Sequence, residues 1–104
     1  MAVDTHKEEE LELYVENTSE LYEHKKKIIA IMITRLEGNR YQRSGVVLLW
    51  KAWLRRGAAM YQREITRETF SPALITSLAG ELADQYKGAI ERHEYTRANM
   101  GLTH

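Results

Sequence analysis

The chain has 104 residues, the length of one domain, so we expect a single domain over residues 1–104. Hydrophobic residues make up 43% and charged residues 29%, a balance that excludes a disordered or fibrous chain. No cysteine is present, which excludes a disulfide framework and a thiolate metal site. The longest aliphatic run, residues 28–33, is far shorter than the roughly 18 residues of a membrane span, and the first residues contain no apolar leader. We therefore expect a cytoplasmic protein that does not contact a membrane.

The charges are segregated along the chain, although the formal net charge is zero. Residues 1–23 contain eight acids and one lysine, residues 24–63 contain ten bases and one acid, and residues 64–104 contain six acids and four bases. The net charges of these segments are therefore −7, +9 and −2. Segments of opposite sign can pair within the chain, pair between subunits, or face two different partners.

The first predicted helix covers about residues 5–36. Thr5 and Glu8 have the spacing of a capping box, which marks a helix start, and Gly38 is placed to end the helix. Its inner side is predicted from residues that recur at intervals of three or four: Leu11, Tyr14, Thr18, Leu21, Lys25, Ile28 and Met32. Residues 17–19, Asn-Thr-Ser, all favour helix caps, so the alternative is two helices with a break near Thr18. We favour the single helix.

A glycine-bracketed, polar and basic segment follows, and it is predicted to be a loop over residues 38–45. The second predicted helix then covers about residues 44–67. Its apolar face is wide, as expected for a helix in the centre of a bundle.

The third predicted helix follows a short connection at residues 68–70. Ser71 as the N-cap and Pro72 as the first helical residue predict its start, and its apolar pattern extends to about Asn99. These elements predict an all-α fold, an antiparallel three-helix bundle that becomes a four-helix bundle if the first helix breaks.

Three glycines lie inside the second and third predicted helices: Gly57, Gly80 and Gly88. Glycine inside a helix costs roughly 0.5–1 kcal/mol relative to alanine, so each needs an offsetting benefit. Their small size leaves space for a bulky side chain of a neighbouring helix, and we expect close helix contacts at these positions.

The sequence contains none of the motifs that would indicate catalysis. There is no His-Glu-x-x-His zinc motif, no Glu-x-x-His pair of the kind that holds a di-iron centre, no Gly-x-Ser-x-Gly elbow and no Walker A loop. We therefore predict that the chain is not an enzyme and uses no metal and no cofactor.

The basic middle segment is the strongest candidate for a binding surface. Arg40 and Arg43 flank Tyr41 on the predicted loop, an arrangement suited to phosphate contact and base stacking. Three further cations lie on the second predicted helix, where we expect one basic ridge. The candidate partner-binding or nucleic-acid-binding residues are therefore Arg40, Tyr41, Arg43, Lys51, Arg55 and Arg56. The alternative is that these charges are only the solvated side of a bundle.

These features favour a non-catalytic helical interaction protein, a regulator or assembly component that uses acidic and basic surfaces. One alternative is a nucleic-acid-binding protein that uses the same basic residues. A second is a small inhibitor of a nucleic-acid-handling protein, whose carboxylates at 9, 12, 16, 20 and 23 imitate phosphates. Zero net charge gives little protection against self-association, so we also expect a homodimer.

Overall fold

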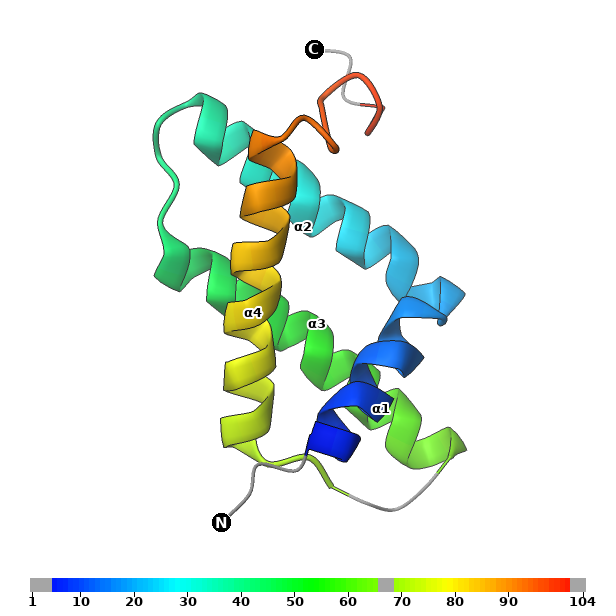
Figure 1. Ribbon diagram of the computed structural model, residues 1–104. Coiled ribbons are helices and arrows are strands. Elements are labelled where there is room, and N and C mark those ends of the chain that lie inside the picture. Colours follow the sequence, from blue (N-terminus) through cyan, green and yellow to red (C-terminus); the bar gives the residue numbers. More distant parts are fainter. Residues whose placement is uncertain (1–4, 66–68, 102–104) are drawn as a thin grey trace.

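The computed structural model describes residues 5–65 and 69–101, and within these ranges it contains helices and no strand. The four helices are α1 (Thr5–Glu16), α2 (Ser19–Glu37), α3 (Arg43–Glu64) and α4 (Pro72–Glu91). The predicted all-α fold is confirmed. The helices pack on one another through one cluster of buried side chains, as in a bundle (Figure 1).

The predicted first helix is broken, so the alternative with a break near Thr18 is confirmed and the single helix is wrong. Thr18 is extended, with φ −101° and ψ 110°, and stands at the N-cap position of α2. Its hydroxyl donates to the Tyr14 carbonyl over 2.6 Å, and the Asn17 amide donates to the Leu13 carbonyl over 2.9 Å. These side chains bind the carbonyls of the last turn of α1, which ends the helix and lets the chain change direction.

The predicted loop is shorter than expected, because α2 ends at Glu37 and α3 already begins at Arg43. The left-handed residue after α2 is Asn39, with φ 57°, and not the neighbouring glycine. The Arg40 N–H donates to the Arg35 carbonyl over 2.8 Å, which completes a common helix-ending motif. At the other end of α3, residues 66–68 lie outside the described ranges, and with them lies the predicted end of that helix.

The start of α4 is confirmed, whereas its predicted end is wrong. Ser71 Oγ accepts from the Leu74 N–H over 3.1 Å, and Pro72 is the first helical residue. The helix stops at Glu91 and not at Asn99, because His93 adopts a left-handed conformation with φ 62°. The residues that follow fold back on the bundle. Tyr95 packs edge-on against Tyr86 of α4 at 5.6 Å, and Arg97 Nη1 lies 3.1 Å from a Glu37 carboxylate oxygen.

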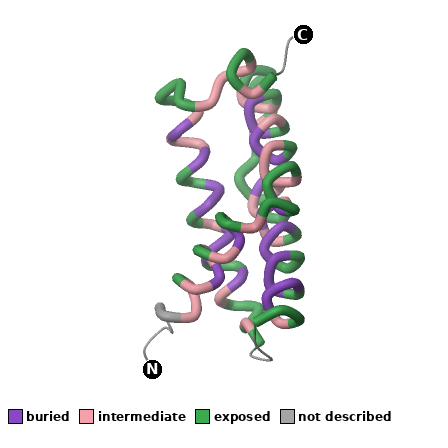
Figure 2. The backbone as a smooth tube through the Cα atoms, turned by 90° about the vertical axis from the view of Figure 1, so that its right-hand side faces the viewer, coloured by how far each residue is buried: buried purple, intermediate pink, exposed green. Residues whose placement is uncertain are grey.

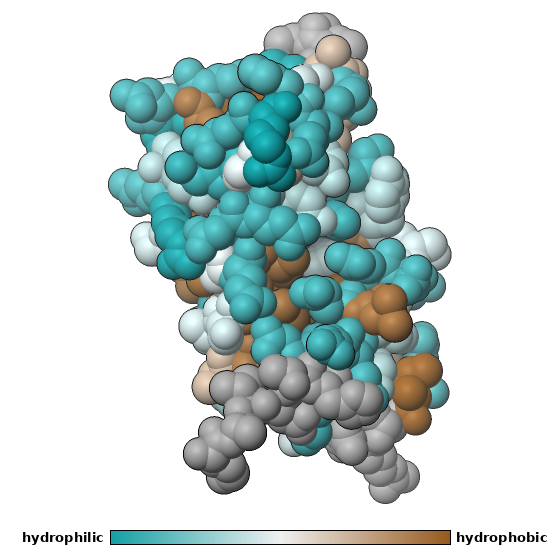
Figure 3. Space-filling model, in the orientation of Figure 1, coloured by the Kyte–Doolittle hydropathy of each residue, from teal (hydrophilic) through white to brown (hydrophobic). Residues whose placement is uncertain are grey.

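The helices form two layers. In Figure 1, α4 crosses α2 and α3, and α1 lies on the same side as α4. Figure 2, turned by 90°, shows buried positions between the layers and exposed positions on their outer sides. The face seen in Figure 3 is mostly hydrophilic, with hydrophobic surface at the lower right, over α1 and the end of α3. In Figures 1 and 2, no helix of the described residues covers the side of α2 and α3 that faces away from α4.

Two tryptophans of α3 form the centre of the core. Trp50 and Trp53 have exposed fractions of 0% and 1%. The Trp50 ring stacks on Tyr86 of α4 at 5.0 Å, and Trp53 Nε1 donates to the Leu21 carbonyl of α2 over 2.9 Å. α3 thus contacts both α2 and α4 through large aromatic side chains.

The close contact expected at the glycines is found at one of them. A Cβ added to Gly57 would overlap Val15 Cγ1 of α1, so glycine is what allows α1 to pack on α3. At Gly80 and Gly88 an added Cβ would meet only the ends of arginine side chains. Close packing therefore does not explain those two glycines.

Candidate functional site

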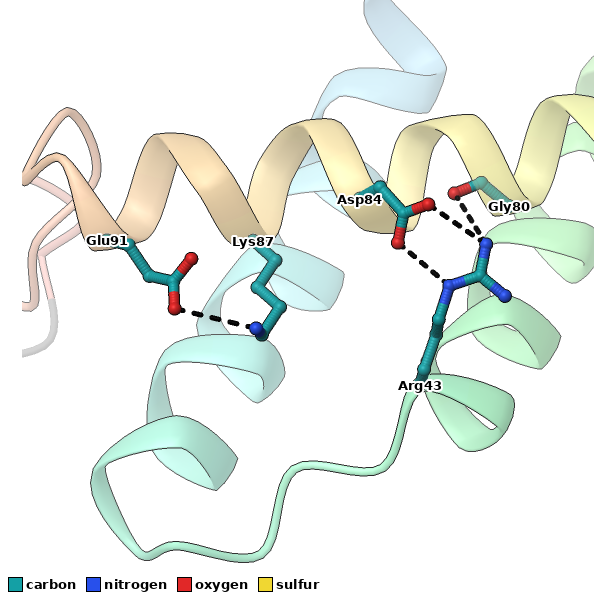
Figure 4. A network of polar contacts seen from close by, with 5 residues as sticks. All are labelled: Arg43, Gly80, Asp84, Lys87 and Glu91. Atoms are coloured by element: carbon teal, nitrogen blue, oxygen red, sulfur yellow. Dashed lines mark hydrogen bonds and ion pairs between the residues drawn. The ribbon is translucent and has the colours of Figure 1, made fainter.

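Two of the predicted site residues, Tyr41 and Arg43, contact α4. Arg43 is the first residue of α3 and not part of the loop, and its Nε and Nη2 donate to the two Asp84 carboxylate oxygens over 2.8 and 3.0 Å (Figure 4). The Lys87 ammonium lies 5.6 Å from the centre of the Tyr41 ring. These two residues join the start of α3 to α4.

The Arg43–Asp84 pair has the electrostatic signature of a bidentate ion pair. Its hydrogen bonds lower the pKa of Asp84 below the ordinary value and raise the pKa of Arg43 above it. Arg43 Nη2 also lies 3.4 Å from the Gly80 carbonyl. Because its guanidinium is occupied by α4, Arg43 is a poor choice for contact with an external anion.

The other four predicted residues make none of these contacts with α4. Arg40 lies between α2 and α3, and Lys51, Arg55 and Arg56 lie on α3. Together with two cations of α2, they lie on the uncovered outer side of α2 and α3 or along its edges. We call this set the basic face: Lys27, Arg35, Arg40, Lys51, Arg55 and Arg56.

The basic face is not neutralised by carboxylates. Within residues 5–65 and 69–101, no ion pair includes any of its six side chains. Arg56 Nη1 instead lies 3.5 Å from His24 Nδ1, across the seam between α3 and α2. Burial, Arg56 and Lys27, in that order, lower the pKa of His24. The histidine therefore senses the positive potential of this surface.

A shallow depression of about 420 Å³ lies at one end of the basic face. It is lined by Ala30, Ile31, Thr34, Arg35 and Arg40. Arg35 and Ile31 were not among the predicted site residues, although both lie within the first predicted helix. The signal that could have found Ile31 is its spacing of four and three residues from Lys27 and Thr34, which places it beside them and outside the apolar stripe of Leu21, Ile28 and Met32.

The carboxylates of α1 gather elsewhere, against α4. Glu8, Glu9, Glu12 and Glu81 line a hollow of about 270 Å³. The pKa of Glu8 is raised, and partial burial is the largest cause. A hydrogen bond with Glu81 and repulsion by neighbouring carboxylates raise it further. Partial burial and neighbouring carboxylates also raise the pKa of Glu12. These four carboxylates of α1 and α4 therefore gather in a hollow whose described lining includes no residue of the basic face.

The break in the first predicted helix also divides the five carboxylates that were expected to imitate phosphates. Glu9, Glu12 and Glu16 lie on α1, whereas Glu20 and Glu23 lie on α2. They do not form one continuous helix face.

A third hollow, a groove of about 560 Å³, lies where the α1–α2 junction meets the end of α3. Leu13 and Ile65 line it with exposed fractions of 64% and 61%. Tyr14 also belongs to the lining, and its hydroxyl donates to Glu64 over 2.7 Å. Aliphatic, aromatic and acidic groups therefore meet in one groove, which no sequence motif indicated.

Comparison with protein-family models, with curated proteins and with solved structures finds no match. In the part of the chain that the structure describes, no three His, Asp or Glu side chains are grouped to hold a metal ion. No described helix has the length and apolar character to cross a membrane.

Proposed function

We propose that this chain is a non-catalytic interaction protein of the cytoplasm, a regulator or assembly component that binds an anionic protein surface through the basic face. The observation that carries this proposal is the lack of ion pairs at all six cations among the described residues. Arg43, Arg92 and Arg97, in contrast, each pair with a carboxylate of the chain itself. Unpaired cations on an uncovered surface attract and orient an anionic partner.

Apolar side chains on the same side favour a protein as the partner. Leu48 and Ile31 have exposed fractions of 63% and 36% among these cations. A surface that combines aliphatic and arginine side chains is typical of a protein interface.

Nucleic acid is the second candidate, because the same cations suit phosphates. Tyr41, the residue expected to stack on a base, argues against it. Its hydroxyl is buried without a hydrogen-bond partner, and its ring packs beside Lys87 of α4. Burial raises the pKa of this hydroxyl, in agreement with an enclosed position.

The composition of the buried core supports the proposal of a non-catalytic role. Among the described residues, no charged side chain is buried. Active sites commonly depend on acids and bases whose pKa values burial has shifted strongly, and the cations of the basic face are exposed or half-buried.

The test compares two anionic probes at low salt, fluorescein-labelled poly-L-glutamate and a labelled DNA duplex. We expect the polypeptide to bind and Arg40→Gln with Arg56→Gln to weaken its binding by roughly tenfold. Arg92→Gln is the matched control, because it removes an exposed arginine outside the basic face.

Preference for the duplex, with affinity that falls linearly against log salt, would replace the protein partner with nucleic acid. Failure of both probes to bind would overturn the proposal.

A further inference from the structure

This chain has two separate surface patches that are complementary to each other: one is basic, the other is acidic, and both contain exposed aliphatic side chains. The first is a strip on the outer side of α3, formed by Leu48, Lys51, Ala52 and Arg55. Residues three, four and seven positions apart lie on one side of a helix, so these cations flank the leucine. Leu48 is 63% exposed, whereas the opposite side of α3 is buried.

The second surface is the groove at the α1–α2 junction. Three carboxylates line it, those of Glu10, Glu20 and Glu64, and among residues 5–65 and 69–101 no lysine, arginine or histidine belongs to its lining. Leu13 and Ile65 add two largely exposed aliphatic side chains. Leu48 and its neighbouring cations therefore match this groove in apolar character and in charge.

The groove cannot be filled by the strip of the same molecule. Leu48 and Ile65 are seventeen positions apart near opposite ends of α3, a separation of about 25 Å along the helix axis. The strip must therefore meet the groove of another molecule.

We propose that the occupant of the groove is a second copy of this chain, which inserts Leu48 between Leu13 and Ile65 while Lys51 and Arg55 meet Glu20 and Glu64. This inference rests on the proposed function and names the anionic partner of the basic face. A formal net charge of zero leaves no overall repulsion between copies.

The geometry also defines the type of assembly. In a closed twofold dimer, the same patch occupies both sides of the interface, whereas here two different patches meet. Each bound copy still offers a free strip at one end and a free groove at the other. Association is therefore head to tail and continues beyond two copies unless a ring closes.

The experiment uses two variants that carry complementary defects. Leu48→Ser removes the apolar centre of the strip and keeps every charge, and Leu13→Ser with Glu20→Gln impairs the groove. All three side chains are exposed, so the fold should be retained, which circular dichroism checks. Tyr22→Ser is the control, because Tyr22 is 57% exposed on α2 and belongs to neither patch.

Sedimentation at low salt measures the outcome. We expect the wild type and Tyr22→Ser to exceed twice the 12.1 kDa mass of one chain as concentration rises, and to dissociate as salt is added. Each defective variant alone should remain at the mass of one chain. Their mixture should form a pair of one copy each and grow no further, since only one intact strip and one intact groove can meet.

A wild type that stays at 12.1 kDa at high concentration and low salt would overturn this inference, as would variants whose mixture forms no pair. The poly-L-glutamate test separates this failure from failure of the proposed function. If Leu48→Ser and the wild type bind that probe equally while the wild type remains monomeric, the basic face keeps its role and only the second copy is rejected.

Discussion

The indole N–H of Trp53 donates to the main-chain carbonyl of Leu21 over 2.9 Å. Trp50, one turn earlier on α3, is equally buried, but its indole N–H has no partner. Both changes to phenylalanine remove buried volume, and only Trp53→Phe also breaks a hydrogen bond. We therefore expect Trp53→Phe to lower the free energy of unfolding by about 1–3 kcal/mol more than Trp50→Phe. Urea unfolding measures the difference, and equal losses would contradict it.

Gly57→Ala should destabilise the protein. The new methyl group would overlap Val15 and push α1 away from α3, with a steric cost of roughly 1–3 kcal/mol that exceeds the gain of up to about 1 kcal/mol in helix propensity. Gly88→Ala is the control, because its methyl group would meet only the flexible end of Arg92. Thermal unfolding should show a lower Tm for the first variant and an unchanged or higher Tm for the second. The opposite order would exclude the α1–α3 contact described here.

Glu81→Gln should stabilise the protein at neutral pH. In the folded state the pKa values of Glu8 and Glu12 are raised, so ionisation disfavours folding, and stability increases as pH falls through these raised values. Removing the charge of Glu81 relieves part of this repulsion, and we expect a gain of roughly 0.2–0.5 kcal/mol at pH 7. The gain should vanish near pH 4, where the carboxylates are protonated. Glu20→Gln, outside this cluster, should show no such pH dependence in urea unfolding.

Arg56→Gln should raise the pKa of His24 toward its ordinary value. Burial is the largest cause of the lowered value and Arg56 is the next, so the correction will be incomplete. Because the pKa of folded His24 is below 6.5, this residue contributes stability above that pH which is lost as pH falls through the lowered value. NMR titration of the imidazole signals measures the shift, with Arg92→Gln as the control. An unchanged pKa would show that Arg56 and His24 do not interact in solution.

The sequence was sufficient for the fold class and for the starts of α1, α3 and α4 to within one residue, because apolar periodicity and the Ser71–Pro72 start are local signals. The cap-forming residues around Thr18 indicated a possible break, but local signals could not decide between one helix and two. The pattern from Leu11 to Met32 suits one long helix, and the contacts that favour the break, such as the fit of Val15 against Gly57, join residues distant in sequence. The end of α4 was missed because His93, and not a glycine, takes the left-handed position.

The candidate site could be predicted only in part, because it too depends on contacts between residues distant in sequence. Charge segregation along the chain indicated a basic surface, yet the partner of each cation depends on contacts distant in sequence. Arg43 and Asp84 are separated by 41 positions, and no local pattern relates them. Leu48 did not belong to the apolar face predicted for the second helix, and the helical repeat places it on the side opposite Trp50, but no local pattern marked it as a binding residue.

The location of both tryptophans decides how partners of this protein can be detected. Trp50 and Trp53 are enclosed by the core, so their fluorescence emission will change on unfolding. It will not change when a molecule binds the outer side of α2 and α3. The chain has no cysteine, so a single thiol introduced at the exposed position of Ala52 would be the one attachment point for a dye.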